Sequence, residues 1–313
     1  MPDAQPIANA VDVRAALKEA IARLRATKVS SDTLAAELLL MHTLGRDRTW
    51  LYTHPEHRID PAAVDAYFKL IARRAAGEPT QYLTGKQEFW GLEFEVTPAV
   101  LIPRPETEHV IEVALARLGE HGIKINMKTG APSPALRVAD VGTGSGCLAV
   151  ALAHELPHAE IVATDISATA LEVARRNAAK HAVAGRIQFL EANLLEGVFQ
   201  RSQVTNHEPR LFDLVVSNPP YIADRDAASL PVEVRHHEPH SALFGGATGI
   251  EIYAQLIQQA GALLHPGGIL VLELGHNSAD KVCKMFQVER HWANVSITND
   301  LAGIPRVMAA ERA

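Results

Sequence analysis

The sequence predicts an α/β protein in which a small helical bundle precedes a larger sheet domain. Three observations support this fold class. Apolar residues recur at helical spacing in residues 1–84, short apolar runs alternate with helical patterns after residue 135, and 313 residues exceed what one hydrophobic core usually holds. Strands that alternate with helices are typical of a parallel sheet covered on both faces. We therefore expect two parts joined by a short connection.

Three helices are predicted in the N-terminal bundle, residues 1–84. The first carries its apolar residues on one face: Val13, Leu17, Ile21 and Leu24. A second helix runs to about Gly45. A third begins with Asp60 as its cap and Pro61 at its first position, and it ends at Gly77. These apolar stripes are expected to form the core of the bundle rather than a cofactor site.

The connection between the two parts is predicted to be a β-hairpin. The hydrophobic period changes from helical to alternating between Gln87 and Val96, with a turn at Trp90–Gly91. The prolines at 103 and 105 then stiffen an extended segment. Residues 85–104 are therefore expected to serve as hairpin and hinge.

Residues 105–313 are predicted to form the larger domain. Short apolar runs mark its strands: Leu136–Val141, Ile161–Thr164, Ile187–Leu190, Leu211–Val216 and Ile269–Leu272. Residues 119–134 resemble a loose linker, and residues 200–210 resemble a polar insertion in a loop. Such a sheet binds ligands beyond the carboxyl ends of its strands, so functional residues are expected at that edge.

The run Asp140–Gly146 lies where the first of these strands gives way to a helix, and it contains three alternating glycines. Glycines at this position let a ligand approach the backbone. Gly144, Gly146 and Ala149 also fit the Gly-x-Gly-x-x-Ala fingerprint of dinucleotide sites, so an oxidoreductase with a nicotinamide or flavin stays open. Asp140 favours another ligand, because its carboxylate can order the loop and face an ammonium group. S-adenosylmethionine has such a group, and a pyrophosphate lacks it.

The next two strand ends offer candidate contacts to a nucleoside. Asp165 ends the second strand, where an acid can bridge both ribose hydroxyls. It can equally cap the helix that begins near Ser167, and the two roles are compatible. After the third strand, Asn193 can hydrogen-bond the adenine amine with Leu194 packed on the ring. The alternative for Asn193 is a simple turn residue.

The strand Leu211–Val216 leads to the loop Asn218-Pro219-Pro220-Tyr221 at the same edge. The two prolines restrict the backbone and donate no hydrogen bond, so the loop is stiff and rich in acceptors. The Asn218 side-chain carbonyl and the Pro219 backbone carbonyl can accept both protons of one NH2 group, while the Tyr221 ring covers its planar face. Methyl transfer to such a nitrogen needs orientation above all, with the nitrogen about 3 Å from the methyl carbon, and no metal. The alternative is a tight turn in a non-catalytic binding module.

The formal net charge of -6 argues against a partner held mainly by phosphate contacts. Adenine N6 presents the same planar NH2 group as a carboxamide, so a nucleic-acid amino methyltransferase is the chief rival enzyme. Four arginines of the bundle have acidic neighbours and are expected to form a solvated face: Arg46, Arg48, Arg73 and Arg74. With 47% hydrophobic and 21% charged residues, no membrane-length apolar run and no secretory signal, a cytoplasmic protein that does not bind a membrane is expected.

Several motifs cover nearly the whole chain: Gln81–Gly85, Glu88–Trp90, Leu101–Glu108, Gly142–Gly146, Ser217–Ile222 and Asp300–Arg306. Together they resemble the release-factor glutamine methyltransferases, often called the HemK or PrmC type. The stretch Ile102–Glu108 and the loop Asn218–Tyr221 together are far more specific for this family than either motif alone. A sister family acts on a glutamine of a ribosomal protein, and the segment Asp300–Arg306 is more similar to the release-factor branch.

The resemblance implies a class I, Rossmann-like methyltransferase domain that uses S-adenosylmethionine. It further implies N5-methylation of the glutamine in the Gly-Gly-Gln motif of class I peptide chain release factors. The candidate donor-binding residues are Asp140, Gly142, Thr143, Gly144, Ser145, Gly146, Asp165, Asn193, Leu194 and Asn218. The candidate substrate-binding residues are Arg104, Asn218, Pro219, Pro220 and Tyr221, of which the last four are also the candidate catalytic residues.

Two further expectations concern partners and departures from the family. The N-terminal bundle holds no donor motif, so we expect it to recognise the protein substrate. A monomer without direct nucleic-acid contact is expected. Where many relatives have an acid followed by an aromatic residue, this chain has Asn193-Leu194, which makes the adenine contact the weakest of the assignments.

Overall fold

The computed structural model describes residues 11–120, 135–198, 211–289 and 291–313 and divides the chain into two compact units. Unit 1 comprises the N-terminal residues up to Lys86 together with Pro231–His237, and unit 2 comprises Gln87–Leu230 and Glu238–Ala313. Most of the predicted linker and the predicted insertion at 200–210 lie outside the described residues. None of the helices described is both long and apolar enough to cross a membrane.

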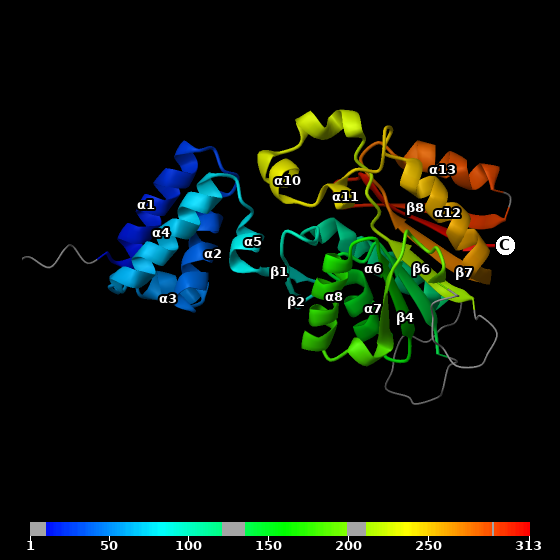
Figure 1. Ribbon diagram of the computed structural model, residues 1–313, viewed down its shortest axis with the longest axis horizontal. Coiled ribbons are helices and arrows are strands. Elements are labelled where there is room, and N and C mark those ends of the chain that lie inside the picture. The colour runs from blue at the N-terminus through cyan, green and yellow to red at the C-terminus, as the bar shows by residue number, and fades with distance from the viewer. Residues whose placement is uncertain (1–10, 121–134, 199–210, 290) are drawn as a thin grey trace, which may run out of the picture. The chain divides into compact units, whose positions relative to one another are not determined.

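Unit 1 is a bundle of helices (Figure 1). Its helices are α1 (Val13–Ala26), α2 (Asp32–Leu44), α3 (Arg48–Thr53), α4 (Pro61–Ala75), α5 (Thr80–Thr84) and α10 (Val232–His237). The three predicted helices are confirmed, and their ends follow the expected chemistry. Asp60 accepts a hydrogen bond from the Ala62 amide, and Gly45 ends α2 with a φ of 61°. The short helices α3 and α5 lack enough residues to show a hydrophobic period.

The core of unit 1 is apolar and closed. Its members include the fully buried side chains of Leu24, Leu39, Leu40, Tyr67 and Ile71. One buried ion pair connects α10 to α4, because the Arg74 side chain, 5% exposed, donates to Glu233 at 2.6 Å. The apolar stripes of the bundle are therefore core packing, as the sequence predicts.

In the described part of unit 2, seven strands form one sheet in the order β5-β4-β3-β6-β7-β9-β8. The strands are β3 (Arg137–Val141), β4 (Glu160–Asp165), β5 (Ile187–Glu191), β6 (Phe212–Ser217), β7 (Leu264–Glu273), β8 (Trp292–Asn299) and β9 (Pro305–Arg312). The first five in chain order run parallel, and β9 pairs antiparallel with both β7 and β8. The strand order reverses at β3, which puts the expected ligand edge beside β3 and β6.

Helices cover both faces of this sheet, and alternate strand residues separate into two cores. Val138, Leu214 and Val271 pack on the face with α6 (Glu108–Glu120), α7 (Cys147–Glu155) and α8 (Ala168–Lys180). Ala139 and Val215 pack on the other face with α12 (Glu251–Leu263) and α13 (Ala279–Val288). The remaining short elements are η1 (Pro105–Thr107), η2 (Ala184–Arg186), η3 (Asp224–Ser229) and α11 (His240–Leu243).

The predicted hairpin is present as β1 (Lys86–Phe89) and β2 (Leu92–Glu95). Trp90 and Gly91 form its turn with φ values of 54° and 69°. Phe89 and Phe94 are buried in the core beneath α6, α7 and α8. The hairpin is thus part of the packing of unit 2.

The C-terminal part of the sheet differs from the sequence prediction. The predicted strand Ile269–Leu272 is the second half of the longer β7, and β8 and β9 add an antiparallel edge. Most residues of β8 are exposed, so its sequence shows no apolar alternation. The predicted parallel sheet is confirmed for β3 to β7, and β8 and β9 extend it by an antiparallel edge that the sequence pattern does not predict.

Candidate active site

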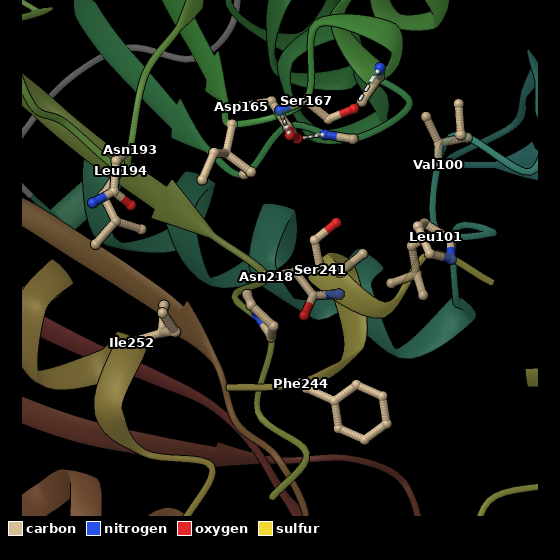
Figure 2. Close-up of a pocket in the computed structure, with 18 of the residues that line it drawn as sticks. Val100, Leu101, Asp165, Ser167, Asn193, Leu194, Asn218, Ser241, Phe244 and Ile252 are labelled. Carbon is tan, nitrogen blue, oxygen red and sulfur yellow. Dashed lines mark hydrogen bonds between the residues drawn. The ribbon is translucent and has the colours of Figure 1, made fainter. Parts of the chain in front are cut away.

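A cavity of about 200 Å³ opens at the carboxyl ends of β3, β4, β5 and β6. Sequence-predicted residues from all four strand ends line it: Gly142, Gly144, Asp165, Asn193, Leu194, Asn218 and Pro220. Figure 2 shows Asp165, Asn193 and Asn218 around the same space. The parallel sheet therefore brings together residues that are far apart in the sequence.

The loop after β3 is shaped by glycines and fastened to β4. Gly142 and Gly144 take φ values of 72° and 53°, which side chains rarely adopt. The amides of Gly142 and Thr143 donate to the Thr164 carbonyl at 2.9 and 2.8 Å. A Cβ atom added to Gly142 would meet no described protein atom within 4 Å, so the space above the loop is free for a ligand.

Asp140 lies beneath this loop and is fully buried. One carboxylate oxygen accepts from the Thr143 hydroxyl at 2.6 Å and from the Ala149 amide at 3.0 Å. Burial raises the pKa of Asp140 to about 7, although these two hydrogen bonds lower it. Of the candidate donor-binding residues in this loop, Asp140, Thr143, Ser145 and Gly146 do not line the cavity. The two hydrogen bonds of Asp140 order the loop. The contact of Asp140 with a donor ammonium stays a prediction.

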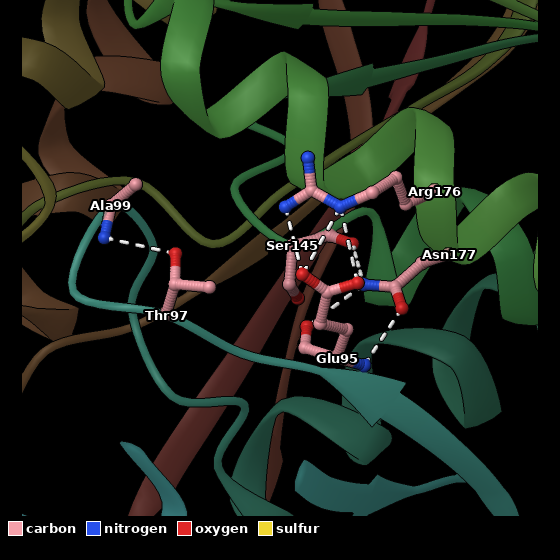
Figure 3. A network of polar contacts seen from close by, with 6 residues as sticks. All are labelled: Glu95, Thr97, Ala99, Ser145, Arg176 and Asn177. Carbon is pink, nitrogen blue, oxygen red and sulfur yellow. Dashed lines mark hydrogen bonds and ion pairs between the residues drawn. The ribbon is translucent and has the colours of Figure 1, made fainter. Parts of the chain in front are cut away.

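The end of the loop is held by Asn177 of α8, which is fully buried (Figure 3). Its side-chain amide donates to the carbonyls of Ser145 and Glu95 and accepts from the Glu95 amide at 2.7 Å. Gly146 lets α8 approach, because a Cβ there would lie 3.1 Å from the Ala174 Cβ. Asn177 thus fixes the loop and the hairpin strand β2 to one helix.

The Asp165 side chain at the end of β4 holds two backbone amides. Its carboxylate accepts from the Gly144 amide and from the Ser167 amide, each at 2.9 Å. Burial raises its pKa, and these backbone hydrogen bonds lower it. The predicted capping of α8 by Asp165 is wrong, because Ser167 is the N-cap and its hydroxyl accepts from the Ala170 amide at 3.2 Å. Each carboxylate oxygen of Asp165 keeps a second lone pair, so a ribose contact is compatible with its two bonds. The contact itself stays a prediction.

Asn193 and Leu194 lie on the cavity wall after β5 (Figure 2). Asn193 donates to the Glu196 carboxylate at 3.3 Å, which suits a turn residue. Leu194 takes a φ of 54°, which is unusual for a branched side chain and directs the chain around the cavity. Both interpretations of Asn193, adenine contact and turn residue, remain open.

The loop after β6 is fixed by close backbone packing. The Ser217 hydroxyl donates to the Val141 carbonyl at 2.6 Å, which joins the ends of β6 and β3. A Cβ atom at Gly245 would lie 2.4 Å from the Pro220 carbonyl oxygen, and one at Gly249 would lie 2.5 Å from the Tyr221 carbonyl oxygen. The Asn218–Tyr221 loop therefore packs directly against the backbone of two glycines. Its own prolines stiffen it further.

The Asn218 side chain takes part in a buried hydrogen-bonded chain. Its Nδ2 donates to the Thr107 hydroxyl at 3.0 Å, and that hydroxyl donates to Glu273 Oε2 at 2.6 Å. Burial raises the pKa of Glu273 to about 7. Tyr221 donates to the other Glu273 oxygen at 3.4 Å, and burial followed by the charge of Glu273 raises the pKa of its hydroxyl.

Three candidate substrate residues lie outside the cavity wall. Pro219 is buried, and the Tyr221 ring packs against Gly275, where a Cβ would come within 2.6 Å of it. Arg104 forms an ion pair with the buried Glu238. The predicted contacts of Arg104, Pro219 and Tyr221 with a substrate amide remain predictions.

The structure adds residues that the motifs do not single out. The segment Ala99–Leu101 after the hairpin and the side chains of Ser241, Phe244 and Ile252 complete the cavity wall. Among the described residues, no group of three or more His, Cys, Asp or Glu side chains is arranged to hold a metal ion. No pattern in the sequence marks Phe244 or Ile252, because their place depends on the folded sheet.

The chain is similar to known proteins along nearly its whole length. Residues 15–85 match the family described as PrmC N-terminal domain, and residues 125–234 match the family described as Methyltransferase small domain. The release factor glutamine methyltransferase of Koribacter versatilis is 41% identical over 301 residues, which cover 96% of this chain and 98% of that protein. The protein of the same name from Moorella thermoacetica is 41% identical over 300 residues, with the same two coverages.

Solved structures share the fold at lower identity. The catalytic domain of hMettl16 in complex with MAT2A 3'UTR hairpin 6 has a TM-score of 0.52 at 16% identity and covers 77% of this chain and 81% of that one. The N-terminal domain of human METTL16 in complex with SAH has a TM-score of 0.50 at 17% identity, with coverages of 78% and 83%. These two likenesses concern the fold alone. On its sequence similarity, the chain belongs to the release factor glutamine methyltransferase family.

Proposed function

We propose that this chain transfers a methyl group from S-adenosylmethionine to N5 of the glutamine in the Gly-Gly-Gln motif of class I peptide chain release factors. The observation that carries this proposal is the 41% identity, over nearly the full length of both chains, to proteins named release factor glutamine methyltransferase. The site supports it, since a glycine loop and the Asn218 loop face one cavity.

The chain's own residues serve to orient the acceptor nitrogen. Asn218 Oδ1 and the Pro219 carbonyl accept the two protons of the glutamine NH2 group, which fixes the plane of the amide. Holding the nitrogen in line with the bond to be broken supplies much of the acceleration. The methylated amide is acidic enough to lose a proton to water, so the proposed reaction uses neither a metal nor a strong general base.

The residues at the ends of β3 and β4 suit the proposed donor. The open space above Gly142 admits a ligand against the backbone, and Asp165 keeps acceptor capacity toward ribose hydroxyls. Bound S-adenosylmethionine supplies a methyl group activated by its sulfonium. Gly142, Gly144 and Asp165 would hold it, with Asn193 and Leu194 beside the adenine.

The bundle of unit 1 is the proposed recognition element for the release factor. Three of the four arginines expected on a solvated face have acidic partners, since Arg48 pairs with Glu37, Arg73 with Glu78 and Arg74 with Glu233. The expectation is wrong for Arg74, which is buried. Arg46 lies over the Trp50 ring. With the net charge of -6, this favours a protein substrate over a nucleic acid. We further propose a monomer that acts in the cytoplasm.

The proposal is tested by offering several acceptors to the full chain. Labelled S-adenosylmethionine is incubated with an intact release factor, a ribosomal protein or nucleic acid, and the label is then located. We expect label on the release factor alone. Label on nucleic acid instead would assign the chain to the rival class that methylates an exocyclic amine. Label on the ribosomal protein would point to the sister activity.

A further inference from the structure

Three segments that are distant in the sequence meet through the side chains of Asn218, Thr107 and Glu273. Asn218 follows β6, Thr107 belongs to η1, and Glu273 ends β7. Thr107 and Glu273 are each only 2% exposed. Their hydrogen bonds run in series, from Asn218 Nδ2 to Thr107 Oγ1 at 3.0 Å and from Thr107 Oγ1 to Glu273 Oε2 at 2.6 Å. The series ends at the wall of the cavity, because Asn218 lines it.

The chemistry of the three groups fixes the direction of this series. An ionised carboxylate only accepts hydrogen bonds, so the single proton of the Thr107 hydroxyl points to Glu273 whenever Glu273 is ionised. The Thr107 oxygen is then available to Asn218 only as an acceptor. Asn218 must therefore turn its NH2 group toward Thr107, and its carbonyl oxygen is left for the cavity. A carbonyl oxygen there accepts from a glutamine NH2 group, whereas an NH2 group there would repel it.

We propose that Thr107 and Glu273 are positioning residues that hold the Asn218 amide with its carbonyl oxygen toward the acceptor nitrogen. This inference rests on the proposed function, because it concerns how the same site orients its substrate. It assigns a role to the threonine of the Leu101–Glu108 motif and to a buried glutamate that the sequence motifs leave unexplained. Neither residue contacts the reacting atoms.

Several neighbouring groups contact Glu273 or act on its charge. Tyr221 donates to Oε1, while the Tyr253 hydroxyl donates to the Glu273 backbone carbonyl at 2.8 Å. The charge of Glu106 raises the pKa of Glu273, and the charge of Arg306 lowers it. Burial, and in addition the charge of Glu273, raises the pKa of the Cys147 thiol and of the Tyr221 and Tyr253 hydroxyls.

Arg306 is itself held in place near this carboxylate. Its guanidinium donates to Asp300 at 2.8 Å, and its backbone carbonyl accepts from the Leu274 amide at 2.6 Å. Asp300 Oδ1 also accepts from the amides of Ala302 and Ile304, which closes the loop between β8 and β9. The Asp300–Arg306 motif thus supports the electrostatic environment of Glu273.

The test replaces the Thr107 hydroxyl by a methyl group, which leaves the volume of the side chain nearly unchanged. In the full chain, Thr107→Val should lower the single-turnover rate of methyl transfer to an intact release factor by roughly 30- to 100-fold, because a freed Asn218 amide can flip. Its donor affinity, measured by calorimetry, should change less than twofold. Thr107→Ser should recover at least a third of the wild-type rate, since it restores the hydroxyl group. Thr298→Val, on the exposed part of β8 in unit 2, is the matched control and should leave the rate unchanged.

The pH profile separates positioning from a merely structural role. A protonated Glu273 can donate to Thr107, and the Thr107 hydroxyl then donates to the Asn218 carbonyl oxygen. The NH2 group of Asn218, in place of its carbonyl oxygen, is then left for the cavity. At saturating donor, the wild-type rate should therefore fall as the pH drops through about 7, the pKa to which burial raises Glu273. This fall should be absent in Thr107→Val, where the series is cut. Burial also raises the pKa of Asp140 to about 7, but a fall caused by Asp140 would occur in Thr107→Val as well as in the wild type.

Each outcome bears on a different claim. If the wild-type chain methylates release factor and Thr107→Val does so at the same rate, the positioning role is refuted while the proposed function stands. The role is also refuted if Thr107→Ser is as slow as Thr107→Val with both variants folded, or if both share the wild-type pH profile. If the wild-type chain itself fails to label release factor, the proposed function fails first.

Discussion

The loops that follow β3 and β6 face the same cavity, yet they are held by different means. The loop Gly142–Gly146 is a backbone structure that is shaped by positive φ angles and fastened from below by Asp140 and Asn177. The loop Asn218–Tyr221 is stiffened by prolines and oriented through the side chains of Thr107 and Glu273. A backbone cradle suits a ligand that must only be bound, whereas an oriented side chain suits an acceptor that must be aligned. We therefore propose that the first loop binds the donor and that the second loop aligns the acceptor for transfer.

The largest expected effect separates the two loops at Asn218. Asn218→Ala should lower the single-turnover transfer rate by about two orders of magnitude, because alignment of the acceptor is lost. Donor affinity by calorimetry should stay nearly intact. Asn299→Ala on the exposed strand β8 serves as the control. An unchanged transfer rate in Asn218→Ala would remove this residue from the mechanism.

A variant at the end of β4 should have the opposite effect, on donor binding and not on transfer. Asp165→Ala should weaken S-adenosylmethionine binding by roughly 1.5 to 3 kcal/mol, the range for hydrogen bonds that involve a charged partner. It also frees the Gly144 and Ser167 amides, which the carboxylate holds at 2.9 Å. The transfer rate at saturating donor should change much less than the affinity. Equal donor affinity in the variant and the wild type would leave Asp165 with only its hydrogen bonds to the Gly144 and Ser167 amides.

Glycine substitutions should separate the two loops with smaller changes in donor affinity and transfer rate. Gly146→Ala adds a Cβ about 3.1 Å from the Ala174 Cβ at a φ of 82°, so donor affinity should fall roughly tenfold. Gly245→Ala would place a Cβ 2.4 Å from the Pro220 carbonyl oxygen, and displacement of that loop should lower the transfer rate roughly tenfold instead. Gly185→Ala, which meets nothing within 4 Å, is the control. Equal effects of both variants on both quantities would contradict the division between the loops.

The smallest expected effect is on stability. The pKa of Glu273 is raised from its ordinary value near 4.5 to about 7 in the folded chain, so its contribution to stability is present below pH 4.5 and is lost as the pH rises to about 7. Glu273→Gln does not titrate. The melting temperature of this variant minus that of the wild type should therefore be larger at pH 8 than at pH 5. A difference that is constant between the two pH values would show that the glutamate is not perturbed.

The two loops also differ in how far the sequence predicts them. The glycines, Asp165 and the Asn218 loop are recognisable because each follows an apolar strand directly, and the carboxyl ends of parallel strands meet at one edge. Thr107 and Glu273 are 166 positions apart, so their hydrogen bond depends on tertiary structure that no local pattern encodes. The same holds for Asn177, which looks like an ordinary helix residue. Strand β8 escapes prediction because it is mostly exposed.

The most direct test of the account compares two forms of one substrate. The full chain is given labelled S-adenosylmethionine and either an intact release factor or the same factor with the glutamine of its Gly-Gly-Gln motif changed to glutamate. Mass spectrometry then locates any methyl group. We expect one methyl group on N5 of the motif glutamine and none on the glutamate form, whose carboxylate offers no NH2 group to Asn218. Methylation of the glutamate form at the same level, or of any other residue in place of the motif glutamine, would contradict it.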